Sequence, residues 1–239
     1  MTRYVIVHGA WHTGAEFEAT AAPLRAAGHE VHLPTLAGNR PGDRKDVGLE
    51  DAIASLLEYL DAARLDDFVL VGHSYGGMII TAVADRIPTR VRRLVYWNAF
   101  VPQDGEALTD LVPPQYAEMF AALRAEDGGI MMPFPIWREA FMNDASLAAA
   151  ESAYGRLNAH PWRTLSDPLR LTRPPAALPM GKSFLNCTED IALPHSHGWH
   201  PRLSERLGLF RLVQCAGSHE LCFTNPELLG HKMMEAGRD

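Results

Sequence analysis

The chain has 239 residues, a length typical of one large domain that buries most of its surface without disulfides or a metal. Hydrophobic residues make up 47% of it and charged residues 21%, as in an ordinary soluble globular protein. The net charge is −7 and the basic residues are scattered, which argues against a nucleic-acid-binding surface.

Strand and helix patterns alternate along the first hundred residues. The predicted elements are a strand at 3–8, a helix at 13–27, a strand at 30–34, a helix at 49–63, a strand at 67–71, a helix from 78 to about 87 and a strand at 91–97. The strands are apolar runs, as in parallel sheets that are covered by helices on both faces. The pattern therefore predicts an α/β fold with a mostly parallel sheet.

Gly72-His73-Ser74-Tyr75-Gly76 lies between a predicted strand and a predicted helix. A Gly-x-Ser-x-Gly sequence in this context is typical of a nucleophile elbow, a tight turn that exposes one serine hydroxyl. The flanking glycines are needed because a side chain there would collide with the neighbouring strand or helix. We expect Ser74 to have a strained backbone and to be the nucleophile. The alternative is a glycine-rich structural turn.

The alternation breaks near residue 102. Residues 103–179 are rich in Pro, Met and aromatic residues, and helical patterns occur at 115–125, 137–141 and 147–157. Strand patterns return at 182–187 and 209–215, and a last helix follows at 226–235. We therefore predict a core domain of residues 1–102 and 180–239, with a helical cap at 103–179 inserted before the last two strands.

A serine hydroxyl needs a base to take its proton, and the base needs a carboxylate to orient it. In folds with a nucleophile elbow the acid and the histidine follow the serine in that order, at strand ends. Asp190 stands three residues after one predicted strand, and His219 stands four residues after the next. We therefore predict a Ser74–Asp190–His219 triad. Glu189 is the alternative acid, and the other position that such folds use holds Asn98, which carries no charge.

Two backbone N–H groups should stabilise the oxyanion. Tyr75 follows the nucleophile at the start of a helix, whose dipole favours negative charge. The loop after the first strand is expected to supply the second group, the N–H of Ala10, because Gly9 lets its backbone approach closely.

Substrate contacts are expected from aromatic residues near the site and in the cap. Trp11 and His12 are expected at the pocket entrance, and Phe134 and Trp137 supply apolar surface in the cap. The alternative is that the cap residues only hold the cap on the sheet.

No metal or organic cofactor is expected. His195, His197 and His200 lie close in sequence, but their spacing matches no zinc signature, and we interpret them as a polar loop near the site.

The chain has three cysteines, and their spacing matches no metal-binding motif. Cys187 and Cys215 lie in strand-like runs where buried free thiols are expected, which favours a reducing compartment. The chain begins with a strand pattern in place of a signal peptide, and no uninterrupted apolar stretch could span a membrane. We therefore expect a cytoplasmic protein without a membrane partner; the oligomeric state is left open.

Five segments together resemble the α/β-hydrolase superfamily, and within it the small bacterial esterases similar to plant methylesterases and hydroxynitrile lyases. They are His8 to His12, Val71 to Met78, Tyr96 to Pro102, Cys187 to Asp190 and Gly217 to His219. The resemblance covers residues 3–102 and 180–236 and implies the same triad and oxyanion residues as above.

Two positions depart from the hydroxynitrile lyases of this group. The lyases carry Thr where Gly9 stands and Lys where Glu220 stands. A cation would stabilise departing cyanide and a carboxylate would oppose it, so the resemblance favours hydrolysis.

The favoured function is a serine hydrolase that cleaves a small, apolar or aromatic carboxylic ester or lactone through an acyl-enzyme. One alternative is a carbon–carbon hydrolase, lyase or cofactor-free oxygenase that uses the His219–Asp190 dyad as base. Another is a ligand-binding protein of the same fold with slow turnover.

Overall fold

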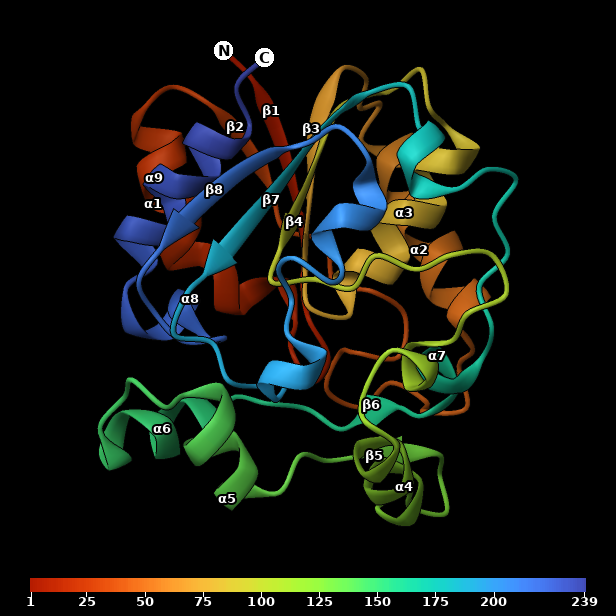
Figure 1. Ribbon diagram of the computed structural model, residues 1–239, viewed down its shortest axis with the longest axis vertical. Coiled ribbons are helices and arrows are strands. Elements are labelled where there is room, and N and C mark those ends of the chain that lie inside the picture. The colour runs from red at the N-terminus through yellow and green to blue at the C-terminus, as the bar shows by residue number, and fades with distance from the viewer.

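The computed structural model describes residues 1–239 and contains a six-stranded parallel sheet between two layers of helices (Figure 1). The strand order is β2-β1-β3-β4-β7-β8, and every neighbouring pair is parallel. The strands are β1 Arg3–Val7, β2 Glu30–His32, β3 Phe68–His73, β4 Val91–Trp97, β7 Gly181–Cys187 and β8 Arg211–Cys215. The predicted parallel sheet is thus confirmed.

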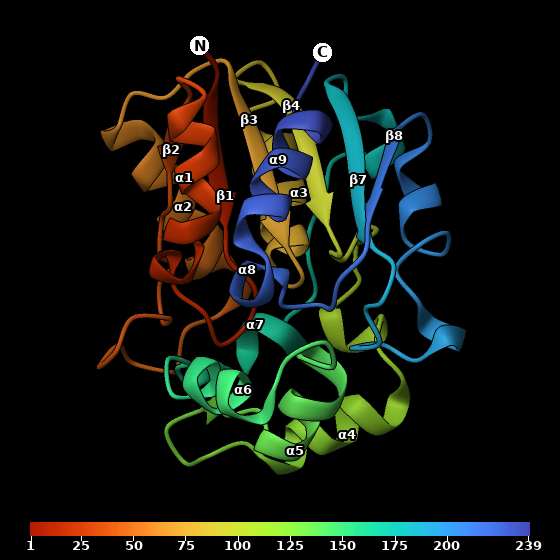
Figure 2. The ribbon, with the colours of Figure 1, turned by 90° about the vertical axis from the view of Figure 1, so that its left-hand side faces the viewer.

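Helices cover both faces of the sheet. The helices α1 (Glu18–Ala26) and α9 (Pro226–Ala236) pack together on one face, beside the short α8 (Leu221–Thr224) (Figure 2). The helices α2 (Leu49–Ala62) and α3 (Gly76–Arg86) cover the other face. Successive strand residues point to opposite faces. In β1, for example, Val5 and Val7 join the cluster with α2 and α3, whereas Tyr4 and Ile6 join the cluster with α1 and α9.

The cap lies across the carboxyl ends of the strands, between β4 and β7 in sequence (Figure 1). It comprises η2 Leu108–Asp110, α4 Pro114–Ala122, β5 Gly129–Ile130, α5 Phe134–Ile136, η3 Trp137–Phe141, α6 Leu147–Tyr154, β6 His160–Pro161, α7 Arg163–Ser166 and η4 Pro175–Ala177. The sequence predicts its helical character but not the antiparallel β5–β6 pair, because two-residue strands are too short to show alternation.

Cap and sheet share one hydrophobic cluster of 47 buried residues. Phe120, Trp137 and Phe141 of the cap belong to it, together with Tyr75 and Tyr96 of the core. The cap is therefore packed as part of the same core. No helix of the structure has the length and apolar character needed to cross a lipid bilayer.

The last third of the chain carries two loops that complete the site. The loop after β7 contains η5 (His195–His197) and η6 (Ser204–Leu207), and the loop after β8 leads into α8. The short turn η1 (Gly14–Phe17) follows β1. All three cysteines are free and buried; Cys187 and Cys215 lie side by side on β7 and β8 with their sulfurs 3.8 Å apart.

Candidate active site

Ser74 occupies a strained turn between β3 and α3. Its φ is +51°, in the left-handed region that residues with a Cβ rarely adopt. A Cβ on Gly72 would lie 2.8 Å from the carbonyl oxygen of Gly76, and one on Gly76 would lie 2.8 Å from that of Val7. Both neighbours are backbone atoms that have no room to move away, so the elbow needs glycine at both positions.

Asp190 and His219 come together because β7 and β8 are neighbours with a common direction. His219 Nδ1 donates to Asp190 Oδ2 at 2.6 Å, and neither side chain is more than 1% exposed. Asp190 Oδ1 accepts the N–H of Ala192 at 2.8 Å. Glu189, the alternative acid, is exposed to solvent and makes no contact of this kind with His219.

Asn98, which the sequence places at the other possible acid position, has a role in the site that the sequence analysis does not assign. It follows β4 with a φ of +36°, and its Nδ2 donates to Asp190 Oδ2 at 2.5 Å. Its Oδ1 accepts the N–H of Cys187 at 2.6 Å. Asn98 thus orients the carboxylate from the neighbouring strand. A polar residue at the end of a central strand is the signal that could have suggested this role.

The environment of His219 favours its protonated form. Burial alone would lower its pKa, but the Asp190 carboxylate and then Glu220 outweigh burial and raise the pKa above the usual 6.5. His73 is the opposite case, because burial and the neighbouring histidines hold its pKa well below that value. His73 is therefore neutral, and its Nε2 donates to the carbonyl oxygen of His219 at 3.1 Å.

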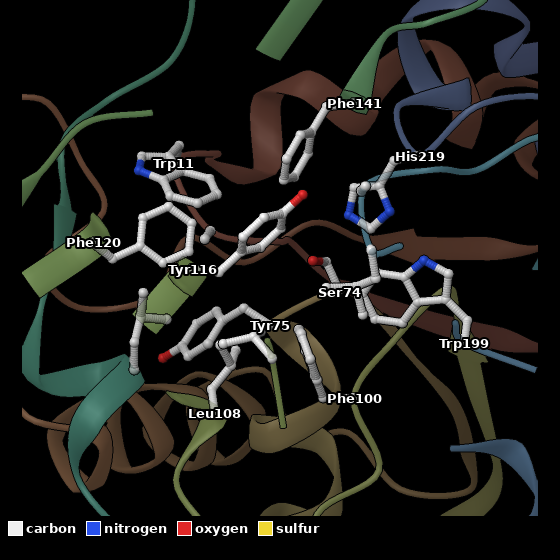
Figure 3. A pocket seen from close by; sticks show the side chains of 15 residues that line it. Trp11, Ser74, Tyr75, Phe100, Leu108, Tyr116, Phe120, Phe141, Trp199 and His219 are labelled. Atoms are coloured by element: carbon white, nitrogen blue, oxygen red, sulfur yellow. The ribbon is translucent and has the colours of Figure 1, made fainter. Parts of the chain in front are cut away.

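Ser74 and His219 lie side by side on the wall of one cavity (Figure 3). No hydrogen bond joins the serine hydroxyl to the imidazole in this structure. Contacts between nucleophile and base are often longer without substrate than in the reacting complex.

The N–H groups of Ala10 and Tyr75 donate to no acceptor in the protein. Both residues line the cavity beside Ser74. The β1 loop reaches the elbow because Gly9 has no side chain: a Cβ there would lie 2.9 Å from His73 Nδ1. Two backbone donors without an acceptor in the protein therefore lie beside Ser74 on the cavity wall.

The cavity has an apolar wall and about 410 Å³ of space free of protein atoms, part of which is open to solvent (Figure 3). Thirteen of its fifteen lining residues are hydrophobic and none is Asp, Glu, Lys or Arg, so it favours a neutral ligand. The lining residues are Ala10, Trp11, Ser74, Tyr75, Phe100, Leu108, Val112, Tyr116, Phe120, Phe141, Leu165, Ala192, Leu193, Trp199 and His219. The hydroxyl of Tyr116, on α4, points into the space between Phe141 and Ser74.

Of the four substrate contacts predicted from the sequence, only Trp11 lines the cavity. Its Nε1 donates to the carbonyl oxygen of Ile130 at 3.2 Å, which fixes the ring against the cap. His12 lies below the cavity wall, 1% exposed, beside Glu220.

The two predicted cap contacts also lie outside the cavity. Trp137 is fully buried and donates from Nε1 to the carbonyl oxygen of Ala150 at 3.2 Å. Phe134 is half-buried against Tyr154. The sequence shows that these rings are apolar, but in such short helical turns it does not show which side faces the cavity.

The histidines after β7 are dispersed. His200 Nδ1 lies 2.7 Å from Ser204 Oγ, and His197 Nδ1 lies 3.0 Å from Ser196 Oγ. The one group of three possible metal ligands within mutual reach consists of His73, His219 and Glu220, and so contains the histidine that pairs with Asp190.

The cap segment 141–144 contacts both loops that carry the acid and the histidine. The Glu220 N–H donates to the Phe141 carbonyl oxygen at 3.2 Å, and Asn143 Nδ2 donates to the Glu189 carbonyl oxygen at 3.0 Å. Asp144 Oδ2 accepts the N–H of Ser218 at 3.1 Å. Phe141 also packs edge-on against the His219 ring. The segment therefore braces the site from above.

A serine elbow, a buried Asp–His pair and a parallel sheet under a cap define a protein of the α/β-hydrolase class. The model of the alpha/beta hydrolase family matches residues 4–231, so the chain belongs to this family.

Several named relatives of the chain are esterases. It is 46% identical to a carbendazim-hydrolysing esterase of a Nocardioides species over 149 residues, which are 56% of this chain and 61% of that protein. It is 34% identical to salicylic acid-binding protein 2 of Nicotiana tabacum over 48% of this chain and 45% of that one. The chain thus aligns with less than two thirds of either protein.

One solved structure matches over the full length. It is an extracellular α/β-hydrolase of a Paenibacillus species, described as sharing structural and functional homology with the tobacco protein. The identity is 36%, the TM-score is 0.96 and both chains are covered completely.

Proposed function

We propose that this protein is a serine hydrolase that cleaves a small, neutral carboxylic ester or lactone through an acyl-enzyme. The observation that carries the proposal is the buried Asp190–His219 pair, which lies beside Ser74 on the wall of a single apolar cavity. The esterase names of the relatives support the same class of reaction.

The proposed reaction begins with attack of Ser74 Oγ on the ester carbonyl carbon, while the serine proton passes to His219 Nε2. The N–H groups of Ala10 and Tyr75 stabilise the oxyanion. His219 then donates its proton to the departing alcohol oxygen, which leaves the acyl group on Ser74. Water, deprotonated by His219, attacks this acyl group, and Ser74 recovers its proton as the acid departs. Asp190 keeps the imidazole oriented and stabilises its charged form.

The lining of the cavity supports a neutral, apolar or aromatic substrate. A charged substrate would lie unpaired among hydrophobic side chains, which is costly. The carboxylate product finds no Lys or Arg there either, which favours its release. The Tyr116 hydroxyl is a polar group above Ser74 that can hydrogen-bond one oxygen or nitrogen of the substrate.

Replacement of Ser74 by Ala tests the reaction. Removal of the nucleophile should lower kcat on a p-nitrophenyl short-chain ester by about 10³-fold or more. The same variant should no longer react with a fluorophosphonate probe, whereas Ser196→Ala, a change in the η5 turn outside the cavity, should leave both properties unchanged. Wild-type turnover by a pure Ser74→Ala preparation would refute the proposal.

Ser74→Ala and His219→Ala, together with a binding measurement, separate the alternative functions. If the His219–Asp190 dyad alone acts as base, Ser74→Ala should keep activity on the true substrate and His219→Ala should lose it. If the protein is a ligand-binding protein, it should bind an aromatic ester tightly and turn over less than about once per minute, well below the usual range of kcat.

We also propose a cytoplasmic location. The sulfurs of Cys187 and Cys215 are adjacent but unbonded, as expected in a reducing compartment. Cell fractionation with detection of the protein tests this, and recovery from the medium would contradict it.

A further inference from the structure

A buried ion pair lies directly beneath the cavity. His12 Nε2 is 3.2 Å from Glu220 Oε2, and both side chains are only 1% exposed. His12 is the one ion-pair partner of the Glu220 carboxylate, which otherwise accepts a weak hydrogen bond from the Cys222 thiol at 3.7 Å. An unpaired buried carboxylate is costly, so this arrangement requires a proton shared within the pair.

The other nitrogen of His12 has an acceptor of its own. His12 Nδ1 is 2.7 Å from the Ala10 carbonyl oxygen, which only accepts, so Nδ1 carries a hydrogen. In a neutral ring Nε2 would then turn its lone pair toward the Glu220 carboxylate. The 3.2 Å approach of Nε2 to Glu220 Oε2 is an ion-pair distance without hydrogen-bond geometry, so the attraction within the pair is electrostatic. Burial would lower the pKa of His12, but Glu220 more than offsets this and raises it.

His8, four residues earlier in the same loop, provides the contrast. Its Nδ1 also faces a carbonyl oxygen, that of Gly9, at 2.8 Å, but its Nε2 accepts the N–H of Leu36 at 3.1 Å. His8 is thus neutral, and burial lowers its pKa to about 4. The pKa values of two buried histidines in one loop are thus shifted in opposite directions, and Glu220 is the partner that raises that of His12.

The pair joins two parts of the site. His12 binds the backbone of Ala10, whose N–H is one of the two free donors beside Ser74. Glu220 follows His219 directly, and its own N–H is bound by the Phe141 carbonyl oxygen. The ion pair therefore links the β1 loop to the loop that carries the histidine.

We propose that His12 and Glu220 are positioning residues, whose ion pair holds the Ala10 N–H at a fixed place relative to His219 and Ser74. The inference rests on the proposed ester hydrolysis. The Glu220 carboxylate is not free to act on a substrate because it faces His12, away from the cavity lining.

Other titratable groups surround the pair. Glu16 of η1, His73 of β3, His8 and His219 lie close enough to interact electrostatically with His12 or Glu220, and Cys222 lies beside Glu220. A variant that changes only the charge of the pair would alter His219 as well as the loop. The test must therefore separate position from charge.

Two variants do so. His12→Phe/Glu220→Leu removes the link but leaves no buried charge unpaired, so it should fold with about wild-type stability. Glu220→Gln keeps the size and shape of the side chain at position 220 without its charge, and the Gln amide can donate to the Nε2 of a neutral His12. The matched control is His32→Phe/Glu30→Leu, the same replacements in a His–Glu pair at 2.8 Å on β2, outside the cavity.

The readouts are kcat and KM on a p-nitrophenyl ester, the rate of labelling by a fluorophosphonate probe, the pH profile and the melting temperature. In the double variant kcat and the labelling rate should fall together by about 10- to 100-fold, while KM stays within about threefold of wild type. The reason is that the displaced Ala10 N–H stabilises the transition state and not the bound substrate. Glu220→Gln and the control should keep kcat within about threefold of wild type.

Two results would overturn the inference. One is a folded double variant with wild-type kcat and labelling rate. The other is a Glu220→Gln enzyme whose kcat, measured at a pH above its acid limb, falls more than about tenfold, since charge and not position would then matter. Failure of the wild-type enzyme itself to cleave esters and react with the probe would refute the proposed function instead, so the two failures are distinguishable.

Discussion

Four imidazole rings lie within or beneath the site, and their hydrogen bonds give them different protonation states. His8 and His73 each have a carbonyl acceptor and a strongly lowered pKa, so they stay neutral. His12 lies between the Ala10 carbonyl oxygen and the Glu220 carboxylate, which raises its pKa above the usual value. His219 faces Asp190 on one side and the cavity on the other. Only His219 is therefore placed to gain and lose a proton during a reaction.

The raised pKa of His219 predicts a pH dependence. The base must be neutral, so kcat/KM should rise with pH through an acid limb that lies above the usual histidine value of about 6.5. The same raised pKa stabilises the folded state at pH values below the unfolded-state pKa of His219. This stabilisation is lost as the pH rises through the folded-state pKa. A pH–rate profile of the wild-type enzyme measures the limb.

Asp190→Asn serves as the control for this prediction. Loss of the carboxylate should move the limb to lower pH and reduce kcat by about 10⁴-fold. A limb at the same pH in both enzymes would show that another group titrates.

The positions of Asp190 and His219 could be predicted from sequence because each stands a few residues beyond a recognisable strand. Their contact then follows from the pairing of β7 with β8. The role of Asn98 could not be predicted, since it depends on a hydrogen bond across from β4. Likewise His12 gives no sign in sequence that its partner is Glu220, 208 positions later.

Among the elements, the elbow tolerates the least change. A Cβ on Gly76 would meet the Val7 carbonyl oxygen at 2.8 Å, and β1 cannot retreat because it is paired on both sides. Gly76→Ala should therefore destabilise the fold by about 1–3 kcal/mol and displace Ser74, so that activity is lost even in the folded fraction. Chemical denaturation and probe labelling measure the two effects.

The matched control is Gly155→Ala, at the end of α6, where the nearest atom would be 3.6 Å away and φ is negative. It should change stability by no more than about 0.5 kcal/mol. Equal effects of the two substitutions would contradict the steric account of the elbow.

The core elements could be predicted because each has a clear periodicity or apolar run. The cap could be predicted only as a set of helical pieces. Its β5–β6 pair has two residues in each strand, and α5 and η3 are single short turns. Such elements show no period, so the orientation of Phe134 and Trp137 depends on packing that sequence patterns do not contain.

At the scale of the whole molecule, cap and sheet form one hydrophobic cluster. We propose that residues 103–179 are an insertion that does not fold independently of the core at 1–102 and 180–239. Cap and core should then unfold in a single transition.

Trp137→Ala tests this cooperativity. Loss of a fully buried indole should cost about 3–5 kcal/mol, which lowers the melting temperature by on the order of 10 °C. Near-UV and far-UV circular dichroism should report coincident transitions in both proteins. Leu147→Ala, at a side chain 55% exposed, should leave the melting temperature nearly unchanged. An early, separate cap transition would show an independent domain.

The segment from Phe141 to Asp144 has a consequence for protein engineering. Its single ring, that of Phe141, forms part of the cavity wall, while its backbone and polar side chains contact the two loops that carry Asp190 and His219. Enlarging the wall at Phe141 to admit a bulkier ester will therefore also loosen the acid–base machinery. Selectivity and turnover cannot be improved independently at this segment, and redesign should begin on the α4 side, at Tyr116 and Phe120.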